Sequence, residues 1–140
     1  MAKNKKDIEE KNSVPVTIKM LLDQYTEILR KIYGSHLKTV ILYGSYARGD
    51  YKADSDIDIM ILLDLSDMDI KQYRHELSGE TFDFNMDHDL DIKPIAKSQQ
   101  HFQNWVDVYP FYANVKREGA PLDRKSTRLN SSHHFISYAV

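Results

Sequence analysis

The chain has 140 residues, of which 41% are hydrophobic and 29% charged, with a formal net charge of −2 at pH 7. This composition is ordinary for a globular domain, and the charge gives no sign of nucleic-acid binding through bulk electrostatics. The chain has no cysteine, which excludes disulfides, thiolate metal sites and cysteine nucleophiles. Its charged start is unlike a signal peptide and its apolar stretches are too short to span a bilayer, so we expect a cytoplasmic protein.

The first half of the chain predicts one helix and two strands. Residues 1–15 form a polar segment, and from Val16 apolar side chains recur at helical spacing until a stop at Gly34. Residues 37–44 form a β-branched run, typical of a buried strand that ends at Gly44. A turn-rich connection with room for a short helical turn leads to a second strand over residues 56–64.

The second half predicts a further helix, a strand and two short helices. Residues 66–87 are interpreted as one helix interrupted at Gly79. Residues 90–98 indicate a third strand, in which Pro94 favours either an edge position or an early end of the strand. Residues 98–119 predict two short helices, and the helical spacing of their large apolar residues favours core packing over a partner surface. The buried candidates in this segment are Phe102, Trp105, Val108, Phe111, Tyr112 and Val115.

This order of elements predicts an α/β (α+β) fold over residues 16–122, with a small mixed β-sheet flanked by helices. The apolar periodicity stops after Leu122. Residues 123–140 read DRKSTRLNSSHHFISYAV, and the simplest interpretation is a disordered tail. The segment also resembles the translation of a common short-read sequencing adapter, with His134 and Phe135 in place of the variable index. We therefore expect residues 123–140 to be non-native and assign no function to them.

Two carboxylates mark the start of the second predicted strand. Asp56 and Asp58 alternate with isoleucines, so both point to one side, about 7 Å apart along the strand. They are either ordinary acidic residues of an exposed face or ligands of a hard divalent cation such as Mg²⁺, which takes carboxylates together with substrate phosphates. A third carboxylate would come from the next strand. Asp91 is favoured because it alternates with apolar neighbours, and Asp89 on the same face is the competitor.

The connection between the two strands carries groups suited to an anion. Gly44 and Ser45 end a strand and lead into a turn, where backbone N–H groups and a hydroxyl can face a phosphate. Arg48 follows three residues later and can reach a phosphate oxygen, although it is equally compatible with a solvated surface arginine. Ser55 can brace the loop in front of Asp56 by hydrogen bonding.

Together, G-S-Y-A-R-G at residues 44–49, S-D-I-D at residues 55–58 and a later strand aspartate resemble the nucleotidyltransferase superfamily typified by DNA polymerase β. The match is closest to its minimal nucleotidyltransferase (MNT) branch. The resemblance implies the polymerase β-like fold, a nucleotide-binding role for Gly44, Ser45, Arg48 and Ser55, and catalytic and metal-binding roles for Asp56, Asp58 and Asp91. It also implies two Mg²⁺ ions, a nucleoside triphosphate substrate, ATP above all, and transfer of a nucleoside monophosphate to a hydroxyl.

The resemblance leaves three kinds of acceptor or role open. Small MNT proteins are often the antitoxins of an all-helical HEPN-type toxin, and some transfer AMP to a tyrosine of that toxin, which we expect here because the chain is short. The alternatives are transfer to a small molecule of the aminoglycoside type, and a non-catalytic antitoxin that acts by binding alone. The acidic cluster argues against the last, since a pure binding module gains nothing from grouped carboxylates.

Overall fold

A computed structural model describes residues 14–122 of the chain. The polar residues 1–13 and the segment 123–140, predicted to be non-native, lie outside the described residues. No helix within residues 14–122 is long and apolar enough to cross a membrane.

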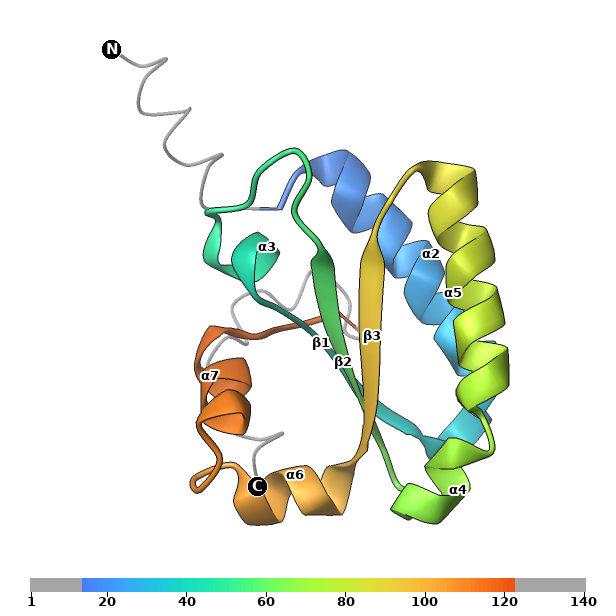
Figure 1. The fold of residues 1–140 in the computed structure, drawn as a ribbon, viewed down its shortest axis with the longest axis vertical. Coiled ribbons are helices and arrows are strands. Elements are labelled where there is room, and N and C mark those ends of the chain that lie inside the picture. The colour runs from blue at the N-terminus through green and yellow to red at the C-terminus, as the bar shows by residue number, and fades with distance from the viewer. Residues whose placement is uncertain (1–13, 123–140) are drawn as a thin grey trace.

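The described residues form a four-stranded mixed sheet between two layers of helices (Figure 1). The elements in chain order are α2 (Val16–Tyr33), a 3₁₀ turn (Gly34–His36), β1 (Leu37–Tyr43), α3 (Ser45–Arg48), β2 (Ile57–Leu63), α4 (Asp67–Lys71), α5 (Arg74–His88), β3 (Ile92–Ser98), α6 (Gln99–Trp105), α7 (Pro110–Glu118) and β4 (Ala120–Pro121). The strand order is β3-β2-β1-β4. β1 is antiparallel to β2 and β4, whereas β2 and β3 are parallel. The predicted fold class is confirmed.

The two central strands are buried on both faces, because alternate side chains of each strand enter different cores. Ile57, Ile59 and Ile61 of β2 pack with the apolar sides of α2 and α5. Met60 and Leu62 of the same strand point the other way and pack against α6 and α7. This alternation fixes the side of the sheet on which the polar residues at the start of β2 lie.

The helix predicted over residues 66–87 is divided differently from the prediction. The break lies at Gln72 and Tyr73, between α4 and α5, and Gly79 sits inside the unbroken α5. Ser66 caps α4 by accepting a hydrogen bond from the Asp69 N–H, and the ring of Tyr73 packs on Tyr33 with 5.0 Å between centroids. Gly79 lies in the middle of this continuous helix, and a Cβ there would meet open space, so nothing in the packing requires a glycine at this position.

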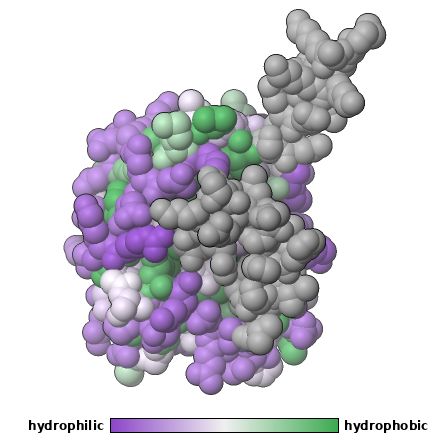
Figure 2. Space-filling model, turned by 180° about the vertical axis from the view of Figure 1, so that it is seen from behind, coloured by the Kyte–Doolittle hydropathy of each residue, from purple (hydrophilic) through white to green (hydrophobic). Residues whose placement is uncertain are grey.

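The core predicted in the aromatic segment is correct for half of its members. Phe102, Tyr112 and Val115 are buried, as expected. Trp105, Val108 and Phe111 are instead among the exposed hydrophobic residues, because the two helices each turn only one narrow side to the sheet, and Val106 takes the buried place between them. Seen from behind in Figure 2, the part of the surface that is not covered in grey is mainly hydrophilic, with separate hydrophobic patches.

The edge position predicted for the third strand is confirmed, and the first half of this edge is poorly suited to further pairing. β3 turns the backbone groups of Asp91 toward β2, where Ile57 N–H donates to the Asp91 carbonyl at 2.9 Å. The backbone groups of Ile92 and Pro94 therefore face outward. The Asn85 side chain bonds both the N–H and the carbonyl of Ile92, at 2.9 and 3.2 Å, and Pro94 has no N–H to offer. Such devices keep an exposed edge from pairing with another chain.

Replacing Asn85 with alanine should lower the free energy of unfolding by about 1–3 kcal/mol, because two backbone groups of Ile92 lose their partners. Chemical denaturation monitored by circular dichroism measures this loss. Met86→Ala on the same helix is the control, since its side chain is 68% exposed and its removal should change stability by less than about 0.5 kcal/mol. Equal effects of the two substitutions would contradict the role assigned to Asn85.

Candidate active site

The turn after β1 lies directly against the start of β2. Tyr43 and Asp58 are opposite one another in the antiparallel pair, which brings Gly44 beside the Asp58 carboxylate. Gly44 has φ 81° and ψ −154°, a conformation almost restricted to glycine. A Cβ added at Gly44 would also collide with Oδ2 of Asp58. Glycine is thus required here both by the backbone and by the close approach of the carboxylate.

A single helical turn follows Gly44 and fixes the predicted nucleotide-binding loop. The N–H groups of Ala47 and Arg48 donate to the Gly44 carbonyl at 3.1 and 3.0 Å. The ring of Tyr46 stacks on Tyr51 with 4.4 Å between centroids and 6° between planes, which ties the turn to the loop that returns to β2. The expected short helical turn is confirmed as α3.

Ser55 braces the end of this loop, as its position predicted. Its hydroxyl accepts a hydrogen bond from the Lys52 N–H at 2.7 Å, and its own N–H donates to the Lys52 carbonyl at 3.0 Å. The loop therefore closes on itself immediately before Asp56. A role of Ser55 toward a nucleotide stays a prediction.

Arg48 is held by two carboxylates. Its Nε donates to Asp50 at 3.1 Å and its Nη1 to Glu118 at 3.2 Å, and these two bonds are the main causes that raise the pKa of Arg48. Burial raises the pKa of Asp58, and the positive charge of Arg48 opposes part of that rise, so Arg48 acts on the carboxylate cluster. Glu118 lies at the end of α7, and no local sequence signal links it to a residue 70 positions earlier. An anion that binds Arg48 has to compete with these two partners.

Asp56 and Asp91 form a close carboxyl pair. Parallel pairing aligns Ile57 with Ile92, so the residues that precede them lie side by side at the same edge of the sheet. The hydrogen bond between the two carboxyl groups is the largest cause of the raised pKa of Asp56, followed by burial and by the charge of Asp91. Two carboxylates this close cannot both ionise freely unless a cation compensates them.

Asp58 is the most enclosed member of the acidic cluster. Burial is the largest cause of its raised pKa, and the negative charges of Asp56 and Asp91 add to it. The neighbouring Tyr43 is 9% exposed, and burial together with the charge of Asp58 raises the pKa of its hydroxyl to about 12. Asp58 lies on the face of the sheet that carries Met60 and Leu62, two and four residues further along β2.

Asp91, rather than its competitor Asp89, stands next to the other carboxylates. Asp89 ends α5 in a left-handed conformation with φ 55° and belongs to the helix terminus. The geometry agrees with the favoured candidate, although the catalytic role of Asp91 stays a prediction.

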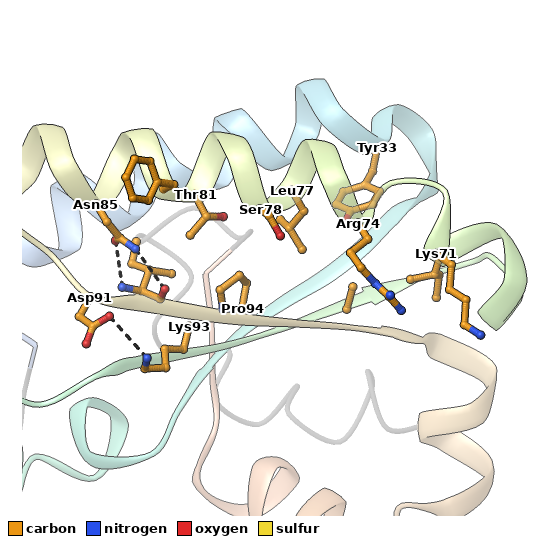
Figure 3. Close-up of a pocket in the computed structure, with 14 residues that line it drawn as sticks. Tyr33, Lys71, Arg74, Leu77, Ser78, Thr81, Asn85, Asp91, Lys93 and Pro94 are labelled. Carbon is orange, nitrogen blue, oxygen red and sulfur yellow. Dashed lines mark hydrogen bonds and ion pairs between the residues drawn. The ribbon is translucent and has the colours of Figure 1, made fainter.

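Lys93 is a member of the site that the sequence analysis did not single out. Its Nζ lies 3.7 Å from Oδ1 of Asp91 (Figure 3). The hydrogen bond with Asp91 raises the pKa of Asp56 and burial raises that of Asp58, and the positive charge of Lys93 opposes part of both rises. Lys93 could have been placed beside Asp91 from the sequence, because residues i and i+2 of a strand point to the same face. Lys93 is the nearest counter-charge to a cluster that holds three acids.

The carboxylate oxygens of Asp56, Asp58 and Asp91 suit a hard divalent cation that completes its coordination shell with water or substrate oxygens. Within residues 14–122, no three acidic, histidine or cysteine side chains are arranged to hold a metal ion by themselves. The paired carboxyls of Asp56 and Asp91, with Asp58 nearby, nevertheless leave negative charge that Lys93 balances only in part. Mg²⁺ characteristically takes one or two carboxylates and completes its shell with water and substrate phosphates.

Comparison with known proteins identifies the family. The profile of the family described as "Nucleotidyltransferase domain" matches residues 22–131, which include the motif residues 44–58 and Asp91. This chain belongs to the nucleotidyltransferase domain family. The match continues beyond the described residues into the segment that resembles an adapter.

Two relatives of this nucleotidyltransferase come from Methanocaldococcus jannaschii. The protein named "Putative protein adenylyltransferase MJ0604" is 34% identical over 101 residues, which are 72% of this chain and 93% of the relative. A second, "Putative protein adenylyltransferase MJ0141", is 28% identical over 92 residues, or 66% of this chain and 91% of the relative.

Two toxin–antitoxin complexes are among the solved structures that the chain matches. One, a toxin–antitoxin with AMP-PNP, matches with 20% identity and a TM-score of 0.43 over 82% of this chain and 84% of the other. The second is a tri-AMPylated Shewanella oneidensis HEPN toxin in complex with an MNT antitoxin. It matches with 20% identity and a TM-score of 0.42 over 85% and 84% of the two chains.

Gly44→Ala should destabilise the nucleotidyltransferase by about 1–3 kcal/mol or more, through backbone strain and the collision with Asp58. Gly79→Ala is a matched control, because the space around Gly79 is open and its helical position should gain about 0.5–1 kcal/mol. Thermal unfolding of both variants measures the difference. A Gly44→Ala protein as stable as the wild type would refute the described geometry of the turn.

Asp58→Asn should raise the melting temperature at pH 7 in the presence of EDTA. The folded-state pKa of Asp58 lies above its ordinary value of 3.8, so this group favours folding most below pH 3.8, and that contribution is lost as the pH rises through the folded-state pKa. At neutral pH the ionised, partly buried carboxylate therefore opposes folding.

The advantage of Asp58→Asn should shrink as the pH falls toward 3.8, where the wild-type carboxyl is protonated. Thermal scans across this range measure the trend. Asp23→Asn, an exposed change on α2, serves as the control and should give no pH-dependent gain. A gain that is constant with pH, or a loss of stability at pH 7, would contradict the prediction.

Proposed function

We propose that this nucleotidyltransferase transfers AMP from ATP to a hydroxyl group of a protein, with Mg²⁺ as cofactor. The observation that carries the proposal is the grouping of Asp56, Asp58 and Asp91 where the parallel strands β2 and β3 begin. The glycine turn at Gly44 packs on Asp58 beside them. The choice of a protein acceptor and of AMP is supported by relatives named as protein adenylyltransferases, of which one is 34% identical.

In this proposal the residues divide into two groups. Gly44, Ser45 and Ser55 shape the loop that receives the triphosphate, and Arg48 provides positive charge after exchanging its carboxylate partners for phosphate oxygens. Asp56, Asp58 and Asp91 supply the oxygen donors for two Mg²⁺ ions, which when bound would neutralise the triphosphate and activate the acceptor hydroxyl.

The acceptor oxygen attacks the α-phosphorus in line with the leaving group. A new oxygen–phosphorus bond forms, the bond between the α-phosphorus and the bridging oxygen breaks, and pyrophosphate leaves. Asp91 lies at the open side of the cluster, where it either helps to hold the ion beside the acceptor or takes the hydroxyl proton as general base. Asp56 and Asp58 would hold the two ions.

We further propose that the acceptor is a tyrosine of a HEPN-type toxin and that this chain is its antitoxin. The support is the resemblance of residues 44–58 to the MNT pattern, together with the small size of a domain that has no additional substrate-binding unit within residues 16–122. Transfer to a small molecule of the aminoglycoside type and neutralisation by contact alone are the alternative outcomes of the test.

Asp58→Ala should reduce AMP transfer by at least about a thousandfold while leaving the circular dichroism spectrum unchanged, because the acidic cluster loses its most enclosed member. The assay combines the protein with Mg²⁺ and α-labelled ATP, CTP, GTP or UTP. Candidate acceptors are the product of the neighbouring gene, a panel of aminoglycosides and a cell lysate.

Label that moves from ATP to a tyrosine of the neighbouring protein, and that is lost with Asp58→Ala, is the expected result. Asp23→Asn is the control and should retain wild-type transfer, since it lies on α2 away from the cluster. Label on an aminoglycoside alone would replace the proposed acceptor. Tight binding of the neighbouring protein without any labelled acceptor would refute catalysis in favour of contact alone.

A further inference from the structure

A groove of about 500 Å³ runs between α5 and the edge strand β3. Asp91 and Lys93 line one end, next to the carboxylate cluster, and Tyr33, Lys71 and Arg74 line the other (Figure 3). The side chains of Asp91 and Lys93 turn to the opposite face of β3, so the groove and the carboxylate cluster lie on the two sides of this edge strand (Figure 3). An acceptor segment in the groove therefore reaches Asp91 by passing around the open edge of β3.

The far end of the groove carries positive charge that the fold does not use. Lys71 and Arg74 are both exposed, and neither has a carboxylate within ion-pair distance among residues 14–122. In Figure 3 the Arg74 side chain extends from the start of α5 across the gap toward β3. Its guanidinium can therefore donate paired hydrogen bonds to a carboxylate held in the groove.

A buried hydroxyl beside Arg74 also lacks a partner. Tyr33 is 3% exposed and lines the groove, yet its hydroxyl makes no hydrogen bond within the described residues. A buried polar group without a partner costs free energy, and either an ordered water or a bound ligand can supply the partner.

The groove favours recognition through side chains rather than through strand pairing. The outward backbone groups of Ile92 are occupied by Asn85, and Pro94 offers no donor. A bound segment therefore finds few free backbone partners along this part of β3. It meets instead the polar side chain of Ser78, the basic pair, and the exposed ring of Phe82, which is 63% exposed.

The charge around the groove distinguishes a carboxylate-bearing peptide from a nucleic acid. α4 and α5 together carry two basic residues, Lys71 and Arg74, against six acidic residues, Asp67, Asp69, Glu76, Glu80, Asp83 and Asp87. None of these six acidic residues lines the groove, but a polyanion that extends along α4 and α5 beyond the basic pair would meet them and be repelled. A peptide can place one or two carboxylates on the basic pair and leave its remaining length neutral.

We propose that the groove between α5 and β3 is the docking site of the protein acceptor and takes a segment with acidic side chains near the modified hydroxyl. Arg74 and Lys71 bind the carboxylates, Tyr33 donates a further hydrogen bond, and Phe82 supplies an apolar contact. The assignment of this segment as acceptor rests on the proposed protein AMP transfer.

The test uses the full chain and two short fluorescent peptides, in which a central tyrosine is flanked by glutamates or, in the matched peptide, by glutamines. Fluorescence anisotropy should show tighter binding of the glutamate peptide, with a preference that weakens as salt rises. Arg74→Glu should weaken binding of the glutamate peptide roughly tenfold or more. Lys31→Glu, an exposed charge reversal on α2 outside the groove, should leave binding unchanged.

Tyr33→Phe separates recognition from folding. Loss of an unpartnered hydroxyl should keep or raise the melting temperature, while the glutamate peptide binds less tightly. Equal affinities for the two peptides would overturn the proposal, as would equal effects of Arg74→Glu and Lys31→Glu. Binding of a single-stranded oligonucleotide with the same dependence on Arg74 would also overturn it.

The same reagents distinguish failure of this inference from failure of the proposed function. AMP transfer to the glutamate peptide should show a raised KM and an unchanged kcat in Arg74→Glu, whereas Asp58→Ala should abolish transfer and retain peptide binding. Arg74-dependent binding without transfer by the wild type would refute the proposed function alone. Transfer with a KM that does not depend on Arg74 would refute the docking site alone.

Discussion

The burial of β2 on both faces is the constraint on which the site depends. Both faces of this strand enter apolar cores, so its register with β1 and β3 cannot slip by one residue without turning every core side chain to the wrong side. Asp58 is carried by this strand and Asp56 stands directly before it. The free energy gained by packing the two apolar cores therefore offsets the repulsion between Asp56 and Asp58. The fold holds acidic groups together that would separate in a looser sheet.

The main elements could be predicted because their signals are local. The apolar spacing of α2, the β-branched runs of β1 and β2, and Pro94 in an edge strand each follow from a short stretch of sequence. The division between α4 and α5 could not be predicted, because it depends on the packing of Tyr73 against Tyr33, 40 positions apart in the chain. The predicted interruption at Gly79 was wrong, because sequence alone does not show whether a glycine lies within a continuous helix.

The candidate site shows the same division between local and distant information. The motif over residues 44–58 is continuous in sequence, and its glycine turn and paired aspartates are where the spacing predicts. The contact between Asp91 and Asp56 could not be predicted in the same way, because it depends on the parallel register of β2 and β3, which no local sequence pattern specifies. The ion pair between Arg48 and Glu118 joins residues 70 positions apart and lies beyond sequence reasoning.

This last ion pair ties the nucleotide loop to the final helix of the described chain. Glu118 ends α7, whose next residues form β4 against β1. A contact that captured Glu118 would leave Arg48 with Asp50 as its remaining partner, and an anion that bound Arg48 would in turn weaken its hold on Glu118. Under the proposed role of Arg48, the end of α7 would thus be coupled to substrate affinity, and a partner protein that bound there would change this affinity without contacting the aspartates.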